Sequence, residues 1–281
     1  MTTARKAGLF VGINNFANFR RYRLRGCIND ATEMRALYED VYQFPKEELT
    51  ILTDQSATKM GIMIHLQELV RRAKVGELDH IVFSFSSHGT QVRDRDGDEA
   101  DGRDEAFVPY DLRMAGSTWD PNTIIVDDEL NALFSQAPEH VTLEVFLDTC
   151  HSGTGLRGAE FGEFAATPRF ILPLGLTLTD LGKIANIVID AASRSLVAES
   201  PDNQVLWTGC RDFETSADAY FSGVGYHGAF TYNYVKVVRE SIGELLTRQE
   251  ILERVRANMA NKFAQSPQLE ASPLLAEESQ T

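Results

Sequence analysis

Two apolar runs constrain the fold of this chain more than any other feature, because each ends at a residue that can do chemistry. Residues 81–87 are rich in β-branched and aromatic side chains and lead to His88, and residues 141–149 lead in the same way to Cys150. Runs of this composition are typical of strands. The carboxyl ends of strands line the ligand crevice of an open α/β sheet. If these two strands are neighbours, His88 and Cys150 face each other there, which is the arrangement of a cysteine hydrolase.

Strand-like runs alternate with helix-like segments along the chain. We expect strands at 7–13, 49–52, 80–86, 141–148 and 204–209, and helices at 30–42, 57–73, 128–136 and 247–263. Asp127 is the expected N-cap of the third helix, and Thr247 opens a capping box at the fourth. The alternation predicts a single α/β domain, with a mostly parallel central sheet flanked by helices on both faces. Residues 151–203 interrupt the pattern as a long connection, and the polar residues 266–281 indicate a flexible tail.

Composition narrows the class of partner. The net charge of −14 disfavours nucleic acid. Three cysteines without CxxC spacing argue against a disulfide framework or a zinc site, and fit a reducing compartment. The apolar run at 7–13 is short for a signal peptide, and no stretch approaches the ~20 residues of a membrane span. We therefore expect a cytoplasmic monomer with neither nucleic acid nor membrane as a partner.

The residues around Cys150 favour a catalytic thiol over a buried structural one. The run 148–153 is polar and small, unlike a core position. A neighbouring imidazolium would lower the thiol pKa from its usual value of about 8.5. Of the six histidines, only His88 ends an apolar strand and is followed by glycine, whereas His227 in a Gly-rich turn is the remaining rival base.

Several acidic residues near these positions admit two interpretations. Asp30 is either functional or the N-cap of a capping box completed by Glu33. Asp148 lies on the same side of its strand as Cys150. It is either a functional residue of the site or the acceptor of a cap or loop hydrogen bond. Residues 91–111 carry eight acids against three arginines, as a solvated loop or a cation site would. This segment is not an EF-hand, since Glu99 stands where that loop needs glycine, but its oxygen density suits calcium.

Short segments spread over most of the chain resemble the metacaspases, and among them the prokaryotic forms called orthocaspases. In chain order they are Leu24–Ala31, Ser86–Gln91, Asp101–Glu105, Val126–Glu129, Asp148–Gly153 and Gly209–Asp218. The resemblance covers about residues 7–265 and implies a caspase-like fold of the caspase-haemoglobinase superfamily. It further implies a large-subunit-like part at 1–155, a connection at 156–203 and a small-subunit-like part at 204–265.

The same resemblance assigns roles to individual residues. Cys150 matches the nucleophile and His88 the proton-transfer base, and the backbone N–H groups of Cys150 and Gly89 match the oxyanion hole. The pocket for the side chain before the cut matches Cys27, Asp30, Ser86 and Asp148. The Gln-Ala-Cys signature of caspases is absent, so their Asp preference is not expected. Two pocket carboxylates would attract Arg or Lys instead.

Calcium is the only cofactor that the resemblance implies. Asp104, Asp127 and Asp128 match calcium ligands, but Arg157 stands where the family has its fourth ligand. Its fixed charge would pair with the same carboxylates. We therefore expect that no cofactor is required and that activity persists in chelator. The alternative is that the acidic loop at 94–101 replaces the missing ligand and restores calcium activation.

Together these observations predict a cysteine endopeptidase that cleaves protein or peptide substrates after Arg or Lys. Self-cleavage in the connection or an upstream activator would switch it on, and the alternative is an ordered insertion that is never cut. The basic residues available for self-cleavage are Arg157, Arg169, Lys183 and Arg194. Two other functions stay open: a non-catalytic caspase-like interaction module, and a calcium-binding regulatory protein.

Overall fold

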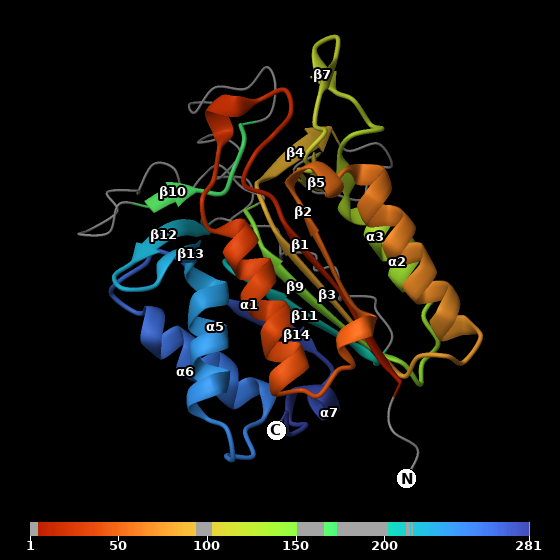
Figure 1. Cartoon of the computed structure of the whole chain (residues 1–281), viewed down its shortest axis with the longest axis vertical. Helices are drawn as coiled ribbons and strands as arrows, with labels where there is room; N and C mark the ends of the chain where they lie inside the picture. Colours follow the sequence, from red (N-terminus) through yellow and green to blue (C-terminus); the bar gives the residue numbers. More distant parts are fainter. Residues whose placement is uncertain are drawn as a thin grey trace.

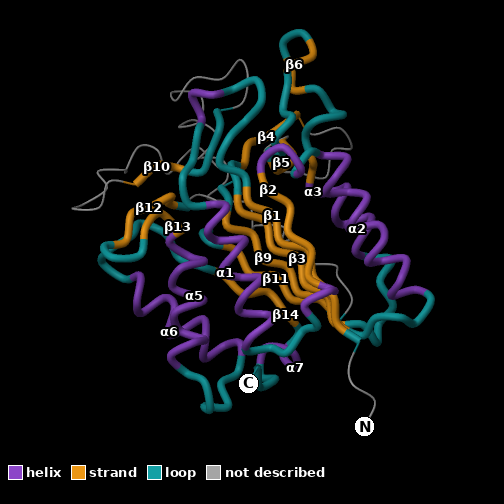
Figure 2. Tube along the Cα trace, in the orientation of Figure 1, coloured by secondary structure: helices purple, strands orange, loops and turns teal. Residues whose placement is uncertain are grey.

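A six-stranded sheet forms the centre of the molecule (Figures 1 and 2). The computed structural model describes residues 5–93, 103–150, 166–172, 202–211, 214 and 216–280. The sheet order is β14-β11-β9-β3-β1-β2, and only β14 runs antiparallel to its neighbour. Its strands are β1 (Lys6–Gly12), β2 (Leu49–Thr53), β3 (His80–Ser86), β9 (Thr142–Asp148), β11 (Gln204–Thr208) and β14 (Gln268–Ala271). The five strands predicted from the sequence are thus confirmed, together with the mostly parallel sheet.

Helices cover both faces of this sheet (Figure 1). One face carries α1 (Cys27–Asp40), α5 (Ala229–Glu240) and α6 (Arg248–Met259), and the other α2 (Lys59–Lys74) and α3 (Asp127–Phe134). Each face has its own apolar cluster, so the inner strands are buried on both sides and read as continuous apolar runs. No helix among these described residues is long and apolar enough to span a bilayer.

Smaller elements lie around the central sheet. One three-stranded sheet contains β4 (Gly89–Arg93), β5 (Arg103–Phe107) and β8 (Ile125–Val126), and another β10 (Ala166–Pro168), β12 (Ala217–Phe221) and β13 (Gly225–Gly228). The remaining pieces are the hairpin of β6 (Met114–Ala115) and β7 (Thr118–Trp119), α7 (Pro273–Ala276), and the 3-10 turns η1 (Arg20–Tyr22), η2 (Lys46–Glu48) and η3 (Asp54–Ser56).

A buried ionic network lies in the core around Glu144. Glu144 of β9 is 1% exposed and accepts hydrogen bonds from Tyr38 Oη (2.8 Å), Trp207 Nε1 (2.9 Å) and Arg248 Nε (3.2 Å). Burial alone would raise the pKa of Glu144, but Arg248, His80 and Trp207 together outweigh it and hold the pKa well below its ordinary value. The network therefore ties α1, β11 and α6 to the middle of the sheet.

Helix starts and the C-terminal segment differ from the sequence expectations. α1 begins at Cys27 with Gly26 as N-cap, so Asp30 lies inside the helix and does not cap it. α3 begins at Asp127, so this residue is the first of the helix and not its N-cap, which is Val126. The capping box at Thr247 is confirmed.

In place of a flexible tail, residues 268–276 form β14 and α7. β14 pairs with the otherwise open edge of β11, and Leu269 packs against the apolar cluster beneath it. The pairing gives hydrogen-bond partners to the backbone groups on the edge of β11. The polar composition of the C-terminal residues does not indicate this pairing, because it depends on a distant strand.

The register of the parallel strands places their carboxyl ends level. Ser86 at the end of β3 is paired with Asp148 at the end of β9, and with Gly12 at the end of β1 on its other side. His88 and Cys150 each follow one of these neighbouring ends by two residues. The sheet therefore brings the two predicted catalytic residues to the same edge, as the sequence suggested.

Candidate active site

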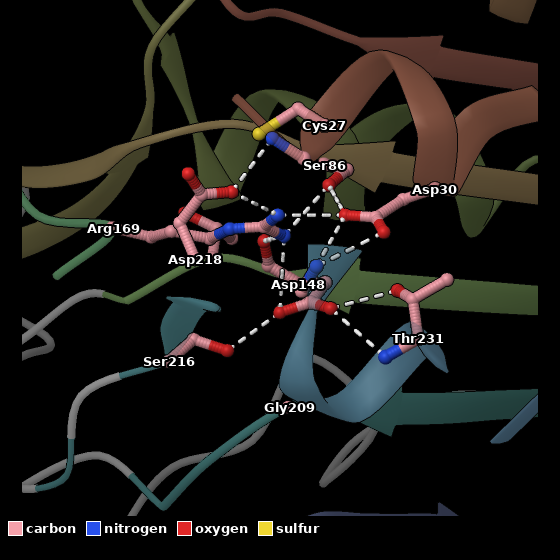
Figure 3. Close-up of polar contacts among 12 residues, drawn as sticks. Cys27, Asp30, Ser86, Asp148, Arg169, Gly209, Ser216, Asp218 and Thr231 are labelled. Atoms are coloured by element: carbon pink, nitrogen blue, oxygen red, sulfur yellow. Dashed lines mark hydrogen bonds and ion pairs between the residues drawn. The ribbon is translucent and has the colours of Figure 1, made fainter. Parts of the chain in front are cut away.

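A fully buried arginine occupies the predicted pocket at this edge. The guanidinium of Arg169 lies between three carboxylates (Figure 3). Its Nη2 is 2.7 Å from Asp30 Oδ2 and 3.1 Å from Asp218 Oδ1. Its Nη1 donates to Ser86 Oγ (2.7 Å) and lies 3.3 Å from Asp148 Oδ1. Three of these four partners were predicted as pocket residues from the sequence.

The pocket is assembled from distant parts of the chain. Asp30 comes from the first turn of α1, Ser86 and Asp148 from the paired ends of β3 and β9, and Asp218 from β12. Cys27, the remaining predicted pocket residue, is fully buried at the start of α1, and burial raises the pKa of its thiol. The sequence reasoning missed Asp218, although this residue ends one of the segments that carry the resemblance.

Each carboxylate also accepts hydrogen bonds from further donors. Asp148 accepts from Ser216 Oγ (2.6 Å) and from both the backbone N–H (3.0 Å) and the hydroxyl (2.7 Å) of Thr231. Asp218 accepts from the backbone N–H groups of Arg25 and Gly26. Hydrogen bonds of this kind fix the position of each carboxylate in the pocket.

Asp30 has hydrogen-bond partners on both of its carboxylate oxygens. It accepts from Gly228 N, and its Oδ1 is 3.1 Å from His227 Nδ1. Burial alone would raise the pKa of Asp30, but Arg169 and His227 outweigh it and keep the pKa below its ordinary value. His227, the rival base of the sequence analysis, is thus committed to the pocket carboxylate.

The main chain passes through the site as strand β10 and then bends at Arg169. β10, which precedes it, pairs antiparallel with β12. The Arg169 carbonyl oxygen accepts from the N–H groups of Gly89 (2.9 Å) and Cys150 (3.3 Å), and Arg169 N donates to Ser216 O (3.0 Å). The two amides predicted as an oxyanion hole therefore already hold a carbonyl oxygen. The residue whose side chain fills the pocket supplies that oxygen.

Gly89 can approach this closely only because it has no side chain. A Cβ at this position would collide with the carbonyl oxygen of Cys150 and press on the Thr149 hydroxyl. The glycine after His88 is thus required by the packing of β4 against the end of β9.

His88 is buried and held in one orientation. Its Nε2 lies 2.7 Å from the Tyr22 carbonyl oxygen, which can only accept, so Nε2 carries the hydrogen and Nδ1 the lone pair. Nδ1 is buried and has no hydrogen-bond partner among the described residues. The rings of Phe16 and Tyr22 pack against the imidazole. Burial and, to a smaller extent, the Arg169 charge lower the pKa of His88 to about 4, against the hydrogen bond to Tyr22 O, which raises it.

The Cys150 thiol is also buried and is bonded to the main chain of Ser216. Its Sγ accepts from Ser216 N (2.5 Å) and donates to Ser216 O (3.4 Å). Cys210 lies beside it in a small cluster, where a hydrogen bond with the Cys150 thiol and burial raise the pKa of Cys210. The thiol and the imidazole thus flank the same stretch of main chain without a hydrogen bond between them in the part described.

The residues predicted as calcium ligands lie elsewhere, near a cavity of about 470 Å³. Asp104 is buried on β5, and Asp127 and Asp128 begin α3. Three acidic side chains, Asp104, Asp128 and Glu129, line the cavity, but so do three basic ones, Lys59, Arg93 and Arg103. This mixed lining differs from the oxygen-rich surroundings that calcium takes.

No group of three or more His, Cys, Asp or Glu side chains within the described ranges is placed to hold a metal ion. The acidic loop 94–101, Arg157, and the possible cleavage residues Lys183 and Arg194 lie outside the described residues.

Known proteins match this chain over most of its length. A family model described as metacaspase, peptidase C14 domain matches residues 5–158. Metacaspase-1B of Neosartorya fischeri is 31% identical over 300 aligned positions, which cover 96% of this chain and 70% of the relative.

Two solved structures share the fold. A crystal structure of a Geobacter sulfurreducens protein has a TM-score of 0.69 at 23% identity, covering 98% of this chain and 97% of that one. Caspase-1 from Spodoptera frugiperda has a TM-score of 0.58 at 11% identity, covering 95% and 86%. The architecture is therefore caspase-like, as the sequence predicted.

The depressed pKa of His88 predicts a loss of stability on mild acidification. The unfolded chain titrates this histidine near pH 6.5 and the folded chain near 4, so between these values the unfolded state binds more protons and stability falls as the pH falls. By this linkage the free energy of unfolding should drop by about 2 kcal/mol between pH 7.5 and pH 5.

Urea unfolding of the uncleavable Cys150→Ala protein across this pH range would measure the drop. Adding His88→Gln should flatten the profile, whereas His140→Gln, which changes an exposed histidine, should leave it as it was. An unchanged slope with His88→Gln would show that another group titrates there.

Proposed function

The chain belongs to the metacaspase family and is a cysteine peptidase, and we propose that it cleaves peptide bonds after Arg or Lys with His88 and Cys150 as its dyad. One observation carries the proposal. Arg169 lies in the site as the residue before a cut would, with its guanidinium among three carboxylates and its carbonyl oxygen on two backbone N–H groups. The bond Arg169–Phe170 is therefore where a scissile bond belongs.

The chemistry follows from the donors and acceptors around that carbonyl. Nδ1 of His88 takes the Cys150 proton, for which the thiol gives up its bond to Ser216 O. The sulfur attacks the carbonyl carbon, and the negative charge that develops on oxygen is stabilised by the N–H groups of Gly89 and Cys150. The imidazolium then protonates the leaving amine, and water hydrolyses the thioester to free the thiol. The hydrogen bond to Tyr22 O holds the imidazole in the tautomer that these reaction steps need.

Specificity for a basic residue follows from the charge of the pocket. Asp30, Asp148 and Asp218 are each at most 2% exposed and direct oxygens at one guanidinium. A substrate carboxylate placed there would add a fourth buried negative charge without compensation. An arginine side chain pairs with several of them at once, and a lysine ammonium with fewer.

The position of Arg169 also supports self-cleavage at this residue. Of the four basic residues considered in the connection, it is the one that the described structure contains. Its side chain, its carbonyl and its amide are all engaged as a substrate's would be. A segment attached to the enzyme reaches the site at a high effective concentration. We therefore assign the first cut to the bond after Arg169.

Calcium is not required in this proposal. Lys59, Arg93 and Arg103 line the cavity beside Asp104, Asp128 and Glu129, and Arg157 stands at the sequence position where the resemblance implies the fourth ligand. The pocket partners of Arg169 described above do not line this cavity. The proposed mechanism thus uses the dyad and the pocket without a metal ion as a structural part.

Charge in the pocket should decide substrate choice. Peptides with Arg or Lys before the cut should exceed the Asp peptide by about a thousandfold in kcat/KM, because opposite charges replace like charges in a dry site. Asp30→Asn and Asp218→Asn should each reduce the ratio between an Arg peptide and its neutral citrulline analogue by at least about tenfold.

Fluorogenic peptides would measure these ratios. Asp79→Asn, the same change at the opposite end of β3, is the matched control and should leave the ratio intact, and Cys150→Ala should abolish turnover. The Arg-to-citrulline ratio is insensitive to a partial loss of folded protein. Efficient cleavage after Asp would refute the pocket assignment.

Self-cleavage should divide the chain between Arg169 and Phe170. Incubated wild-type protein should yield fragments 1–169 and 170–281 by intact-mass analysis, and Cys150→Ala should remain whole. Arg169→Gln should block this cut and Arg169→Lys should retain it, since the pocket requires a positive charge.

Identical masses for wild type and Cys150→Ala after long incubation would contradict self-cleavage at this site. A cut after Arg169 in Cys150→Ala as well would assign the cleavage to another peptidase.

The rate on an Arg peptide should be the same in EGTA and in millimolar calcium. Arg157→Asp restores a carboxylate where relatives have one, and is expected to create or strengthen a calcium response. Lys236→Asp, a similar charge change at an exposed position of α5, serves as the control. A large increase with calcium in the wild type would overturn this expectation.

A further inference from the structure

The two residues that follow Arg169 are buried in the site as firmly as the arginine itself. Phe170 is 6% exposed and packs in a cluster with Cys150 and Cys210, against which Leu172 also packs. Ile171 is fully buried and belongs to the apolar cluster on the α2 side of the sheet. The site thus has apolar contacts on the side where the leaving part of a substrate lies.

Gly89 contacts the main chain on both sides of the proposed scissile bond. Its N–H donates to the Arg169 carbonyl oxygen (2.9 Å), and its own carbonyl accepts from Ile171 N (2.9 Å). Together these bonds form a parallel bridge between Gly89 and Phe170. Gly89 alone therefore fixes the carbonyl that is attacked and the N–H of the next peptide bond, which sets the register of the chain across the thiol.

We propose that this peptidase recognises the two residues after the cut as well as the basic residue before it. This inference rests on the proposed function. The first subsite, bounded by Cys150 and Cys210, takes a large apolar or aromatic side chain in the place of Phe170. The second takes a large apolar side chain in the place of Ile171, on a residue whose backbone N–H is free to donate to Gly89. The preferred substrate is a protein segment of the form basic–apolar–apolar.

Physical magnitudes make this recognition measurable. Burying a large apolar side chain, or forming one backbone hydrogen bond in a dry site, each corresponds to a change of about tenfold in a binding or rate constant. Substrates that end in a dye directly after the basic residue lack both contacts. Such short substrates would therefore report only the pocket for the basic residue.

Internally quenched peptides with the sequence of residues 166–172 would test the proposal with the full-length protein. The parent peptide, Ala-Thr-Pro-Arg-Phe-Ile-Leu, is compared with analogues carrying Ser for Phe, Ser for Ile, or N-methyl-Ile for Ile. The last of these removes the N–H and leaves the side chain. Because the chain's own segment competes with every peptide alike, ratios of kcat/KM are unaffected by it. Mass spectrometry of the products verifies that each cut follows arginine.

Each replacement should lower kcat/KM by at least about fivefold, and N-methylation should do so as strongly as either serine. Equal rates for the parent peptide and all three analogues would overturn the inference and assign the burial of Phe170 and Ile171 to packing of the uncut chain alone. A coumarin amide of Ala-Thr-Pro-Arg separates this result from failure of the proposed function. Its cleavage shows that the peptidase acts after arginine, and its resistance together with that of all peptides would refute both.

Discussion

Three carboxylates share one buried space at the carboxyl edge of the sheet, and the structure around them depends on a single positive charge. Asp30, Asp148 and Asp218 come from separate elements and are almost wholly excluded from water. Buried carboxylates repel one another and lose their hydration, so they stay ionised only with a cation and well-placed donors. Arg169 supplies that cation and joins the connection to α1, β9 and β12. In the proposed reaction, substrate binding exchanges one guanidinium for another, so the enzyme's apparent affinity is set by competition with its own arginine.

Much of the chemistry around this charge is carried by main-chain groups. The N–H groups of Gly89 and Cys150 hold the carbonyl oxygen, the Tyr22 carbonyl orients His88, and Ser216 bonds both to the thiol and to the Arg169 amide. The register of β3 against β9 fixes two of these groups, the N–H groups of Gly89 and Cys150, because it brings the segments after both strands to one level. Such groups are pre-oriented by the fold and need no side-chain identity, which suits the stabilisation of a developing charge.

The division of roles between main-chain groups and side chains explains what could be predicted from the sequence. The five parallel strands were visible because strands buried on both faces read as apolar runs, and the residues after two of them identified His88 and Cys150. Asp30 allowed a local interpretation as an N-cap, and tertiary contacts with Arg169 and Gly228 replaced it. Asp218 was not predicted as a pocket residue, and Arg169 was not predicted to fill the pocket. The sequence around Arg169 does not indicate which residues its side chain contacts in the fold. The pairing of β14 with β11 was missed for the same reason: a polar segment was judged by its own composition, without the open strand edge that it covers.

The tight fit of Gly89 has a consequence for interpreting related sequences. The position tolerates no side chain, because a Cβ there would meet the Cys150 carbonyl oxygen. Any other residue would push β4 away from the end of β9 and move the N–H that holds the carbonyl oxygen. A homologue that retains both members of the dyad but carries a substitution at the position of Gly89 would thus be a pseudoenzyme that the dyad residues alone do not reveal. Gene duplicates could lose catalysis by this route while keeping the fold and the basic-residue pocket, and would then serve as binding decoys for the same substrates.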